Sequence, residues 1–494
     1  MMYKRWYSER MTNLIQHLET LFVDSDVGII TRFRAEGFPT SVSGIQFLCG
    51  AGSPGPVGGV PLGGLGTGYV DFNADGTWGK SSTFNTFVPP RILSTPVFTL
   101  RVDGAVRSLS LRPPEGQQGV ERIHYWGHYP VADTRFETAL PVVVVVRAFS
   151  PFLPGDAGAS NTPGAVLSAR LHNIGPQPVS VALTCHWPGQ QPRKGEQLLR
   201  REHQGDGWHG LVVEDRRGAG SALGVATAGL LGRTSDALAV AIEPASEDET
   251  TLAVTAHCTL DADTWVEVPF VLGWYAPLFR DSDNAPHYHR YSRRFRSAAT
   301  VADYLAVNAA TLLERVLAWQ AVIYDSDLPS WLQDALTNGL YSLAKNSLWT
   351  TSERTDSWWG PDGLFTHSES FTGCPITETM VCRFHGHFPL LFFFPELERT
   401  TLRAFAHYQL KTGEIPFSFG RPNGLNRPHY QCQHPINSTE FVQLVHRYVA
   451  RTGDTALLRE LWPVVLDAVR FARTLDTDGD GLVNDQSHAP EGEY

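Results

Sequence analysis

The sequence is most restrictive in what it lacks. Six cysteines are scattered through 494 residues without a CxxC pair: Cys49, Cys185, Cys258, Cys374, Cys382 and Cys432. Such spacing argues against a structural zinc site and against a dense disulfide framework. No apolar run reaches the roughly 18 residues of a membrane span, so no transmembrane segment is expected. GxSxG, Walker and HExxH motifs are also missing, so the enzyme classes that depend on them have no signature here.

A basic charge excess is missing as well. Lysine and arginine number 40 against 51 acidic residues, the net charge is −11, and no basic run is interleaved with aromatics. This balance disfavours nucleic acid as a partner and fits a neutral small-molecule substrate. The first residues, MMYKRWYSERMTNLIQHLE, are too charged for a signal peptide, so we expect a cytoplasmic protein. The sequence gives no indication of the oligomeric state.

The first half of the chain has the composition of strands. Between Val179 and Trp187 apolar and polar residues alternate, which is typical of a half-buried strand. Similar runs separated by turn residues predict a β-sandwich over residues 44–298, preceded by an N-terminal extension over residues 1–43. The glycine-dense loop at 57–68, VGGVPLGGLGTG, contains spacings that suggest a dinucleotide fingerprint. No βαβ pattern follows it, so a tight cluster of β-turns is the better interpretation.

The second half has helical periodicity. Helices are predicted at 299–324, 328–349, 389–412, 438–452 and 455–475. Ser330 is a candidate N-cap, Ser438, Thr439 and Glu440 supply capping chemistry to a later helix, and Gly453 is a stop signal. Helices joined by long polar loops favour a toroid over a tight bundle. We therefore predict that residues 299–494 form a helical domain with its active site in loops at one end.

One stretch, from Trp358 to Glu398, crowds polar groups against an apolar helix. Polar groups in that setting belong to a site or cost the fold stability. Cleavage of a glycoside needs two carboxyl groups, one as proton donor and one as nucleophile or base. Within the slightly longer range 351–398 the acidic candidates are Glu353, Asp356, Asp362, Glu369 and Glu378. Glu396 and Glu398 fit the solvated first turn of a helix. Glu369 lies between two serines, which suits an ionised carboxylate, although an exposed loop acid is the alternative.

Histidines and aromatics in the same stretch are further candidates. His385 and His387 lack a third ligand for a metal, so we expect a contact to a sugar hydroxyl or, for at least one, a core histidine. The aromatic residues predict either a stacking platform for a sugar ring or ordinary packing: Trp358, Trp359, Phe365, Phe371 and Phe384.

A separate acidic motif follows near the end of the chain. Asp476, Asp478 and Asp480 match the start of a calcium loop, but position twelve is Ser487 instead of glutamate. A structural calcium ion is one interpretation, and a plain Asx-turn loop is the preferred one. No cofactor is expected to be required.

Several segments in sequence order resemble glycoside hydrolase family 116, which includes bacterial β-glucosidases and non-lysosomal glucosylceramidases. They are VPLGGLGTG (60–68), SPFLPGDAGASNTPGAVLSARLHNIGPQPVSV (150–181), FVLGWYAP (270–277), LPSWLQDALTNGLYSLAKNSLW (328–349), FPLLFFFPELE (388–398), FVQLVHRYVARTGD (441–454) and LDTDGDGLVN (475–484). The resemblance implies a β-sandwich followed by an (α/α)6 barrel and a retaining mechanism through a covalent glycosyl-enzyme. By its distance from Pro395–Glu398, Glu369 corresponds to the family nucleophile. The substrate is then a small-molecule glycoside or an oligosaccharide, and the expected contacts are Glu378, Thr379, His385, His387 and Trp359.

The sequence departs from this family in three places. Met380 or Val381 stands where an aspartate that binds the sugar is expected, and Phe417 and Ser418 replace a His-Asp pair. These changes put glucose specificity in doubt. The acid/base aspartate of the family would lie beyond Tyr494, so the chain is expected to be a truncated fragment with only the first half of the toroid, and to be inactive by itself. The alternatives are an inverting (α/α)6 hydrolase or one for another glycan, and a carbohydrate-binding or catalytically dead relative.

Overall fold

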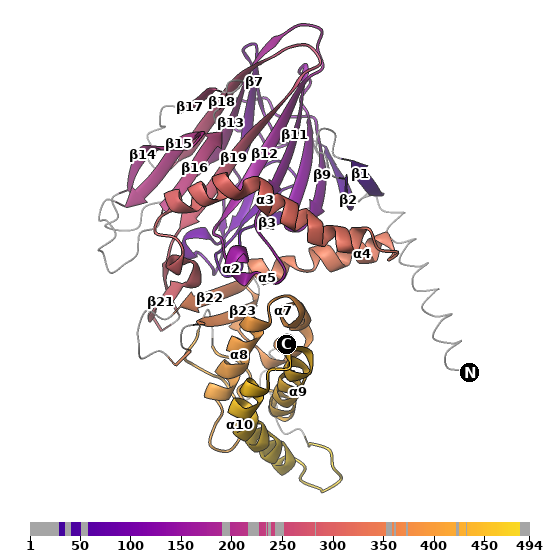
Figure 1. Ribbon diagram of the computed structural model, residues 1–494, viewed down its shortest axis with the longest axis vertical. Coiled ribbons are helices and arrows are strands. Elements are labelled where there is room, and N and C mark those ends of the chain that lie inside the picture. The colour runs from indigo at the N-terminus through magenta and orange to yellow at the C-terminus, as the bar shows by residue number, and fades with distance from the viewer. Residues whose placement is uncertain are drawn as a thin grey trace, which may run out of the picture.

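The computed structural model contains a sheet-rich N-terminal part and a helical C-terminal part (Figure 1). It describes residues 29–34, 41–50, 58–189, 198–215, 227–233, 235, 239–242, 251–281, 283–351, 358–359, 362–371, 374–420, 424–430 and 432–484. None of the helices within these residues combines the length and the apolar character that crossing a membrane requires. The predicted order of a β-sandwich followed by a helical region is thus confirmed.

Two antiparallel sheets form the sandwich. The larger sheet has ten strands in the order β1 (Ile29–Arg34), β2 (Ser41–Gly50), β9 (Arg122–His128), β10 (Val131–Glu137), β11 (Val142–Phe149), β12 (Gly164–Asn173), β19 (Trp265–Tyr275), β16 (Thr227–Arg233), β15 (Trp208–Asp215) and β14 (Leu198–Gly205). The facing sheet has five strands in the order β17 (Ala239–Ile242), β18 (Leu252–Leu260), β13 (Val179–Trp187), β7 (Phe98–Val102) and β8 (Ala105–Ser108).

The core between the sheets follows from the sequence pattern. In β13 the alternate residues from Val179 to Trp187 are buried, as the alternation predicts. Phe98 of one sheet meets Phe270 of the other at a ring distance of 6.0 Å. The large sheet begins earlier than the predicted boundary at residue 44, because β1 and β2 pair with each other and extend it. Residues 29–34 and 41–43, which were assigned to an extension, therefore belong to the sheet. The prediction missed them because short alternating segments give little signal in the sequence.

Two smaller sheets connect the sandwich to the helices. One contains β3 (Gly59–Leu62), β4 (Val70–Asn73), β5 (Trp78–Ser81) and β6 (Arg91–Ile92), and a short 3₁₀ turn, η1 (Thr83–Asn85), lies between its last two strands in the chain. The other contains β20 (Leu278–Arg280), β21 (Pro286–His289), β22 (Ser347–Thr351), β23 (Leu364–Ser370) and β24 (Cys374–Thr377), with η2 (Arg290–Arg293) after β21. Because β22 pairs with β23, the end of the predicted helix 328–349 is a strand.

The helices differ from the prediction mainly in their boundaries. They are α2 (Ala157–Ser160), α3 (Ala298–Tyr324), α4 (Ser330–Asn338), α5 (Tyr341–Lys345), α6 (Met380–Gly386), α7 (Phe388–Phe393), α8 (Pro395–His407), α9 (His434–Thr452) and α10 (Thr455–Thr474). The predicted helix at 389–412 is divided before Pro395, and α9 begins before Ser438, whose hydroxyl instead accepts from the backbone N–H of Ile415. Pro329, not Ser330, occupies the N-cap of α4.

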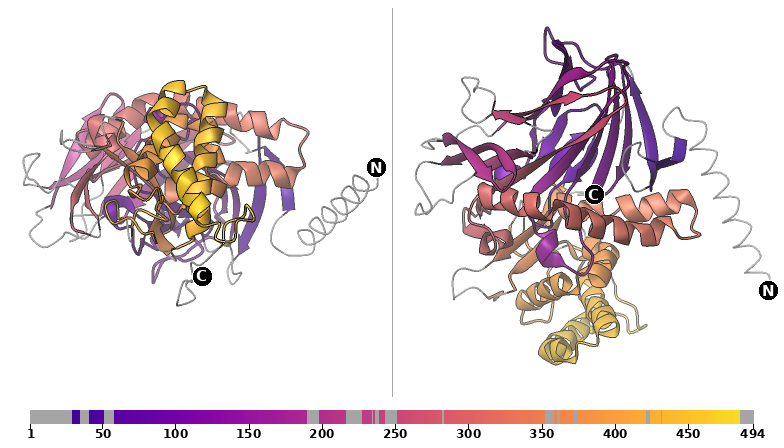
Figure 2. Two further views of the ribbon diagram at one scale, coloured as in Figure 1. Left: turned by 90° about the horizontal axis from the view of Figure 1, so that it is seen from below. Right: turned by 45° about the horizontal axis from the view of Figure 1, so that its top comes forward.

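Helix α3 lies across the outer face of the ten-stranded sheet. Helices α8, α9 and α10 lie together at the end of the molecule that is farthest from the sandwich (Figures 1 and 2). Ser297 caps α3 through reciprocal hydrogen bonds with Thr300. Val301, Ala302 and Leu305 of this helix pack against sheet residues such as Val271. Although the sequence assigned α3 to the helical domain, its apolar face is buried on the sandwich. Completion of a toroid by the later helices remains a prediction.

The glycine-dense loop lies at the junction of the two parts. Of the predicted loop 57–68, residues 63–68 lie in the turn between β3 and β4, in agreement with the predicted turns, whereas Gly59–Leu62 form β3 itself. Gly66 donates its N–H to Ser347 Oγ of β22 at 2.9 Å, and its carbonyl accepts from His289 at 3.0 Å. Leu65 bonds to Ser160 through its N–H and to Asn161 through its carbonyl. The loop thereby positions β22, the neighbour of β23, against the sandwich.

We predict that Gly66→Ala destabilises the protein more than Gly104→Ala does. Both glycines have positive φ, +66° and +90°, which costs alanine about 1–2 kcal/mol. A Cβ on Gly66 would lie 2.5 Å from the backbone nitrogen of Trp349, whereas nothing lies within 4 Å at Gly104. The overpacking should add about 1–3 kcal/mol to the loss for Gly66→Ala. Urea unfolding of the two variants measures the difference, and equal losses would contradict the close approach.

Candidate active site

A cavity of about 380 Å³ opens where β23, the turn between α4 and α5, and α6 meet. Its walls combine carboxylates, histidines, a thiol and apolar groups. They are formed by Gly339, Ser342, Leu343, His367, Glu369, Glu378, Thr379, Cys382, Arg383, His385, Gly386, Pro389 and Leu390. Four predicted site residues, Glu369, Glu378, Thr379 and His385, thus come together, because β23 and the start of α6 are joined by the short strand β24. The predicted metal trio lies elsewhere.

Glu369 lies near the end of β23 and is half-buried in the cavity wall. The hydroxyl of Thr379 donates to its Oε1 at 2.7 Å, and the thiol of Cys382 approaches the same oxygen at 3.5 Å. Its backbone carbonyl accepts from Asn346 at 3.3 Å. Neutral donors therefore hold this carboxylate in place. Cys382 was not predicted from the sequence, although its position one helical turn after Thr379 could have indicated it.

Glu378 lines the same cavity but is committed to other groups. Its carboxylate, which is 2 % exposed, accepts from Arg383 Nε at 2.8 Å, from a second nitrogen of Arg383 and from the backbone N–H of His367. Burial raises the pKa of Glu378 against the attraction of Arg383. Because a guanidinium does not lose its proton in proteins, we take the pair as ionised. Glu378 is an anchor in this arrangement, and its predicted sugar contact has no support.

Arg383 also bonds to Glu398 at 3.1 Å, and both side chains are buried. Burial disfavours the charge of Arg383, but Glu378 and Glu398 outweigh it and raise the pKa of the guanidinium. The prediction that Glu398 is solvated in the first turn of α8 is wrong, because that turn faces Arg383. His387 Nδ1 lies 3.3 Å from the same Glu398 carboxylate, and its Nε2 lies 3.3 Å from Arg447.

The two histidines of the predicted pair differ in position. His387 is fully buried beside Glu398 and is not part of the cavity wall, so its predicted sugar contact is wrong and it is a core histidine. His385 is exposed at the cavity rim, where a contact with a ligand is sterically available. A third histidine, His367, was not predicted. Burial, and then Arg383, lower its pKa to about 4, so it is neutral near pH 7, and its Nε2 donates to the carbonyl of Ser342.

The remaining predicted residues of the stretch lie outside the cavity. Trp359 packs beside His287 at a ring distance of 5.9 Å, so its predicted role as a sugar platform has no support here. Phe365 and Phe371 are in the core. Asp362 bonds to Arg399 at 2.9 Å. Glu353 and Asp356 lie outside the described residues.

Three residues at which the sequence departs from the family pattern, Met380, Phe417 and Ser418, are in the protein interior. Met380 is 0 % exposed, Phe417 is 4 % exposed and Ser418 is 3 % exposed. The N–H of Met380 bonds to the carbonyl of Phe417 at 2.8 Å, which brings the two segments together behind the cavity. Apolar packing therefore occupies places where the resemblance implies polar groups.

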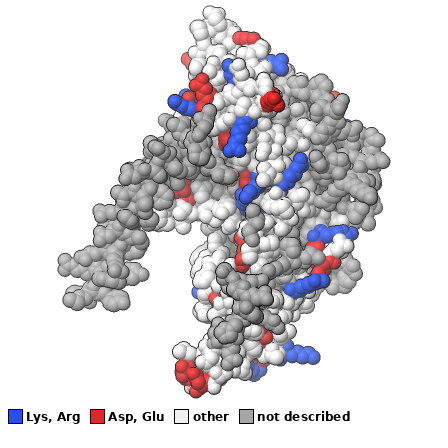
Figure 3. Space-filling view, turned by 180° about the vertical axis from the view of Figure 1, so that it is seen from behind, with Lys and Arg blue, Asp and Glu red and all other residues white. Residues whose placement is uncertain are grey.

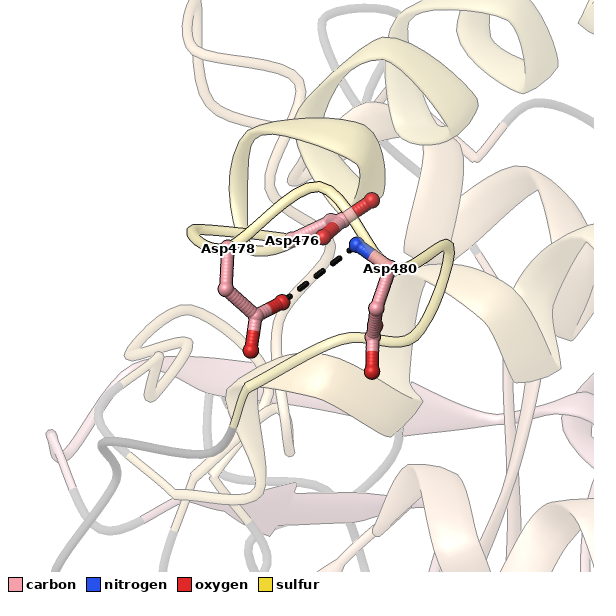
Figure 4. Close-up of side chains that lie close together, drawn as sticks. All are labelled: Asp476, Asp478 and Asp480. Atoms are coloured by element: carbon pink, nitrogen blue, oxygen red, sulfur yellow. Dashed lines mark hydrogen bonds between the residues drawn. The ribbon is translucent and has the colours of Figure 1, made fainter.

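The aspartate loop after α10 lies away from β23, the strand that contains Glu369 (Figure 1). The side-chain oxygens of Asp476, Asp478 and Asp480 come within 4.8 Å of one another (Figure 4). They also accept backbone N–H groups: Asp476 from Gly479 and Gly481, and Asp480 from Leu482. These bonds are those of an Asx-turn loop, and they leave the geometry compatible with calcium. Ser487 lies outside the described residues, so calcium binding remains a prediction.

Charge on the rear face of the molecule is mixed. Among the residues that are described there, lysine and arginine alternate with aspartate and glutamate and form no broad basic patch (Figure 3).

A buried carboxyl in α9 was also missed. Glu440 was assigned to capping, but α9 begins six residues earlier, so Glu440 is inside the helix with 8 % exposure. Its Oε2 has no hydrogen-bond partner among the described residues. Burial raises its pKa to about 7, against the attraction of Arg447.

We predict that Arg383→Met lowers the free energy of unfolding by about 3–5 kcal/mol, because it leaves Glu378 and Glu398 buried without their cation. Arg403→Met is the matched control. Arg403 also binds a carboxylate with two nitrogens, that of Glu460 at 2.8 and 2.7 Å, but this pair is exposed and should contribute less than about 1 kcal/mol. Chemical denaturation compares them, and similar losses would show that burial does not matter here.

We predict that Glu440→Gln changes how stability depends on pH. The folded pKa of about 7 exceeds the ordinary value of 4.5, so the folded state retains a proton that the unfolded state releases. The stability from this proton is fully present below pH 4.5 and is lost as the pH rises through 7. Relative to the wild type, Glu440→Gln should therefore gain about 1–3 kcal/mol between pH 5 and pH 8. Denaturation at several pH values measures this gain. Glu460→Gln, at an exposed position, should show no such trend, and a flat difference for Glu440→Gln would refute the proposed titration.

Two solved structures align with parts of this chain at low similarity. A "putative kojibiose phosphorylase from human microbiome" aligns with a TM-score of 0.49 at 10 % identity, over 90 % of this chain and 60 % of that one. The GH36 alpha-galactosidase AgaA from Geobacillus stearothermophilus, in complex with raffinose, aligns with a TM-score of 0.22 at 10 % identity, over 43 % of this chain and 40 % of that one. This chain therefore spans less than two thirds of either protein.

A family model gives the clearer relationship. It matches residues 59–228, which run from β3 through most of the sandwich to β16. The family is the one that the sequence motifs indicated: residues 59–228 match the model described as "beta-glucosidase 2, glycosyl-hydrolase family 116 N-term".

Proposed function

We propose that this protein is the sandwich and first helical part of a retaining β-glycosidase in which Glu369 is the nucleophile. The observation that carries the proposal is the position of Glu369 in the cavity wall, with its carboxylate held by Thr379 and Cys382 and not by a cation. A nucleophilic carboxylate must be ionised and free to form a bond to the anomeric carbon. The match of residues 59–228 to the family model adds independent support.

The second carboxyl group would come from outside the described cavity wall. Glu378, the other carboxylate that lines the described cavity, is held by Arg383 and cannot readily donate a proton. The proposal therefore assigns no acid/base among the carboxylates of the described cavity wall. The same observation favours the second candidate, a carbohydrate-binding or catalytically dead relative, if the full-length protein supplies no such acid.

The sugar and its leaving group stay open within this proposal. The cavity has a neutral histidine, His367, and an exposed one, His385, as groups able to bond to hydroxyls. Met380 and Phe417 are buried where polar sugar contacts would be expected, which favours a glycoside other than a simple glucoside. A neutral substrate also fits the acidic composition.

We predict that Glu369→Gln in the full-length protein lowers turnover of activated aryl β-glycosides by roughly 10³-fold or more, because the amide cannot form the glycosyl ester. A panel of 2,4-dinitrophenyl β-glycosides of different sugars provides the assay, and Glu396→Gln in the neighbouring helix is the control that should retain activity. NMR of the first-formed anomer tests retention. Undiminished turnover in Glu369→Gln would exclude this nucleophile, an inverted first anomer would establish the inverting alternative, and binding without turnover would establish the inactive relative.

A further inference from the structure

The structure distinguishes the two oxygens of Glu369. Both neutral donors go to the same atom: the hydroxyl of Thr379 lies 2.7 Å from Oε1 and the thiol of Cys382 lies 3.5 Å from it. Among the described residues no donor is found for Oε2. A carboxylate held at one oxygen by two donors has its plane and its second oxygen fixed in direction.

The hydroxyl of Thr379 makes this contact instead of capping a helix. It occupies the N-cap of α6, where a threonine hydroxyl normally accepts a hydrogen bond from the first turn of the helix. No such side-chain bond is present at this cap, and the hydroxyl donates to Glu369 instead. A helix without a side-chain cap is less stable by about 1 kcal/mol. The bond of this hydroxyl to Glu369 instead of to the helix therefore indicates a functional constraint.

The neighbouring residues hold Thr379 in position. Thr379 is 1 % exposed and follows Glu378, which has a left-handed backbone with φ of 53°. The N–H of Glu378 bonds to the carbonyl of His367 at 2.9 Å, and its carboxylate is bound to Arg383. The N–H of Arg383 in turn bonds to the carbonyl of Thr379 at 2.9 Å. The hydroxyl is thus attached to a backbone that is fixed on both sides.

Among the described residues, Arg383 forms no hydrogen bond to Glu369, although Arg383 lines the same cavity. Its Nε and Nη2 bond to Glu378, Nη2 also to Thr401, and Nη1 to Glu398. Burial raises the pKa of the Cys382 thiol to about 11, so Cys382 remains an uncharged donor near pH 7. Glu369 is therefore oriented without an ion pair that would reduce its nucleophilicity.

We propose that Thr379, assisted by Cys382, is a positioning residue that holds Oε1 of Glu369 so that Oε2 attacks the anomeric carbon. The inference rests on the proposed function. In the step, a bond forms between Oε2 and the anomeric carbon while the bond from that carbon to the leaving group breaks. The leaving group takes the electron pair, and a dinitrophenolate does so without a proton. Glu369 becomes a neutral ester whose carbonyl oxygen is Oε1, still bonded to Thr379.

The test is covalent trapping of the protein with a 2,4-dinitrophenyl 2-deoxy-2-fluoro-β-glycoside of the sugar that is turned over fastest in the aryl glycoside panel, followed by mass spectrometry of the labelled peptide. Thr379→Val should lower the limiting rate of trapping by roughly 10- to 100-fold, with less than about a threefold change in apparent affinity, because it removes a hydrogen bond to a charged group. Thr379→Ser restores the hydroxyl and should remain within about threefold of the wild type. Cys382→Ala should have a smaller effect in the same direction.

Thermal melting of each variant identifies losses that are due to misfolding, and Thr379→Ser and Cys382→Ala keep the proposal testable if Thr379→Val does not fold. Trapping of Thr379→Val at the wild-type rate, or a loss confined to affinity, would overturn the positioning role and return Thr379 to a sugar contact. Equal slowing in Thr379→Ser and Thr379→Val would overturn it too. A wild-type protein that hydrolyses an aryl glycoside with inversion, and is not labelled at Glu369, would refute the nucleophile itself and not only its positioning.

Discussion

One buried guanidinium, that of Arg383, determines the shape of the candidate site. It bonds to Glu378 at the start of the α6 segment and to Glu398 in the first turn of α8, and these three side chains are removed from water. Three buried charges are stable only while each retains its partners, so the segments that carry them cannot move independently. Thr379 follows Glu378 directly, and Glu369 bonds to Thr379. The position of the proposed nucleophile thus depends on an ion network that it does not join.

The sandwich contributes to the same site from a distance. Gly66 approaches Trp349 of β22 so closely that a side chain could not be accommodated, and β22 pairs with β23, the strand of Glu369. The core of the sandwich also extends into this region, since Phe365 of β23 and Leu397 of α8 belong to the same apolar cluster as the sheet residues. The glycine-dense loop, whose spacing suggests nucleotide binding when viewed alone, acts here through close backbone contact. The sandwich is thus part of the support for the catalytic half, and not a separate appendage.

Patterns confined to one segment predicted the fold well, and pairings between segments did not. The alternation in Val179–Trp187 depends on one buried face, and the stop signal at Gly453 depends on local backbone geometry, so both were found correctly. Residues 347–349, the start of the strand Ser347–Thr351, were predicted as the end of a helix, because the run before them has helical spacing and only pairing with β23 makes them a strand. The burial of Glu398 was missed for a similar reason: an acid in a first turn suits the helix dipole, and only Arg383 reveals that it faces inward.

The site shows the same limit in chemical terms. The family resemblance gave Glu369 the role of nucleophile and Glu378 that of a sugar contact, but the sequence could not show that Glu378 is bound to a buried guanidinium. The structure separates them by their partners: a guanidinium binds Glu378, and a hydroxyl and a thiol hold Glu369. A carboxylate in a buried ion pair loses stabilisation when it becomes a neutral ester, because its cation is left unpaired. A carboxylate held by neutral donors keeps a hydrogen bond to its carbonyl oxygen in both states. Of the two, Glu369 alone can be esterified and released without disrupting the charges beneath the cavity, and this difference, more than its position in the sequence, makes it the candidate nucleophile.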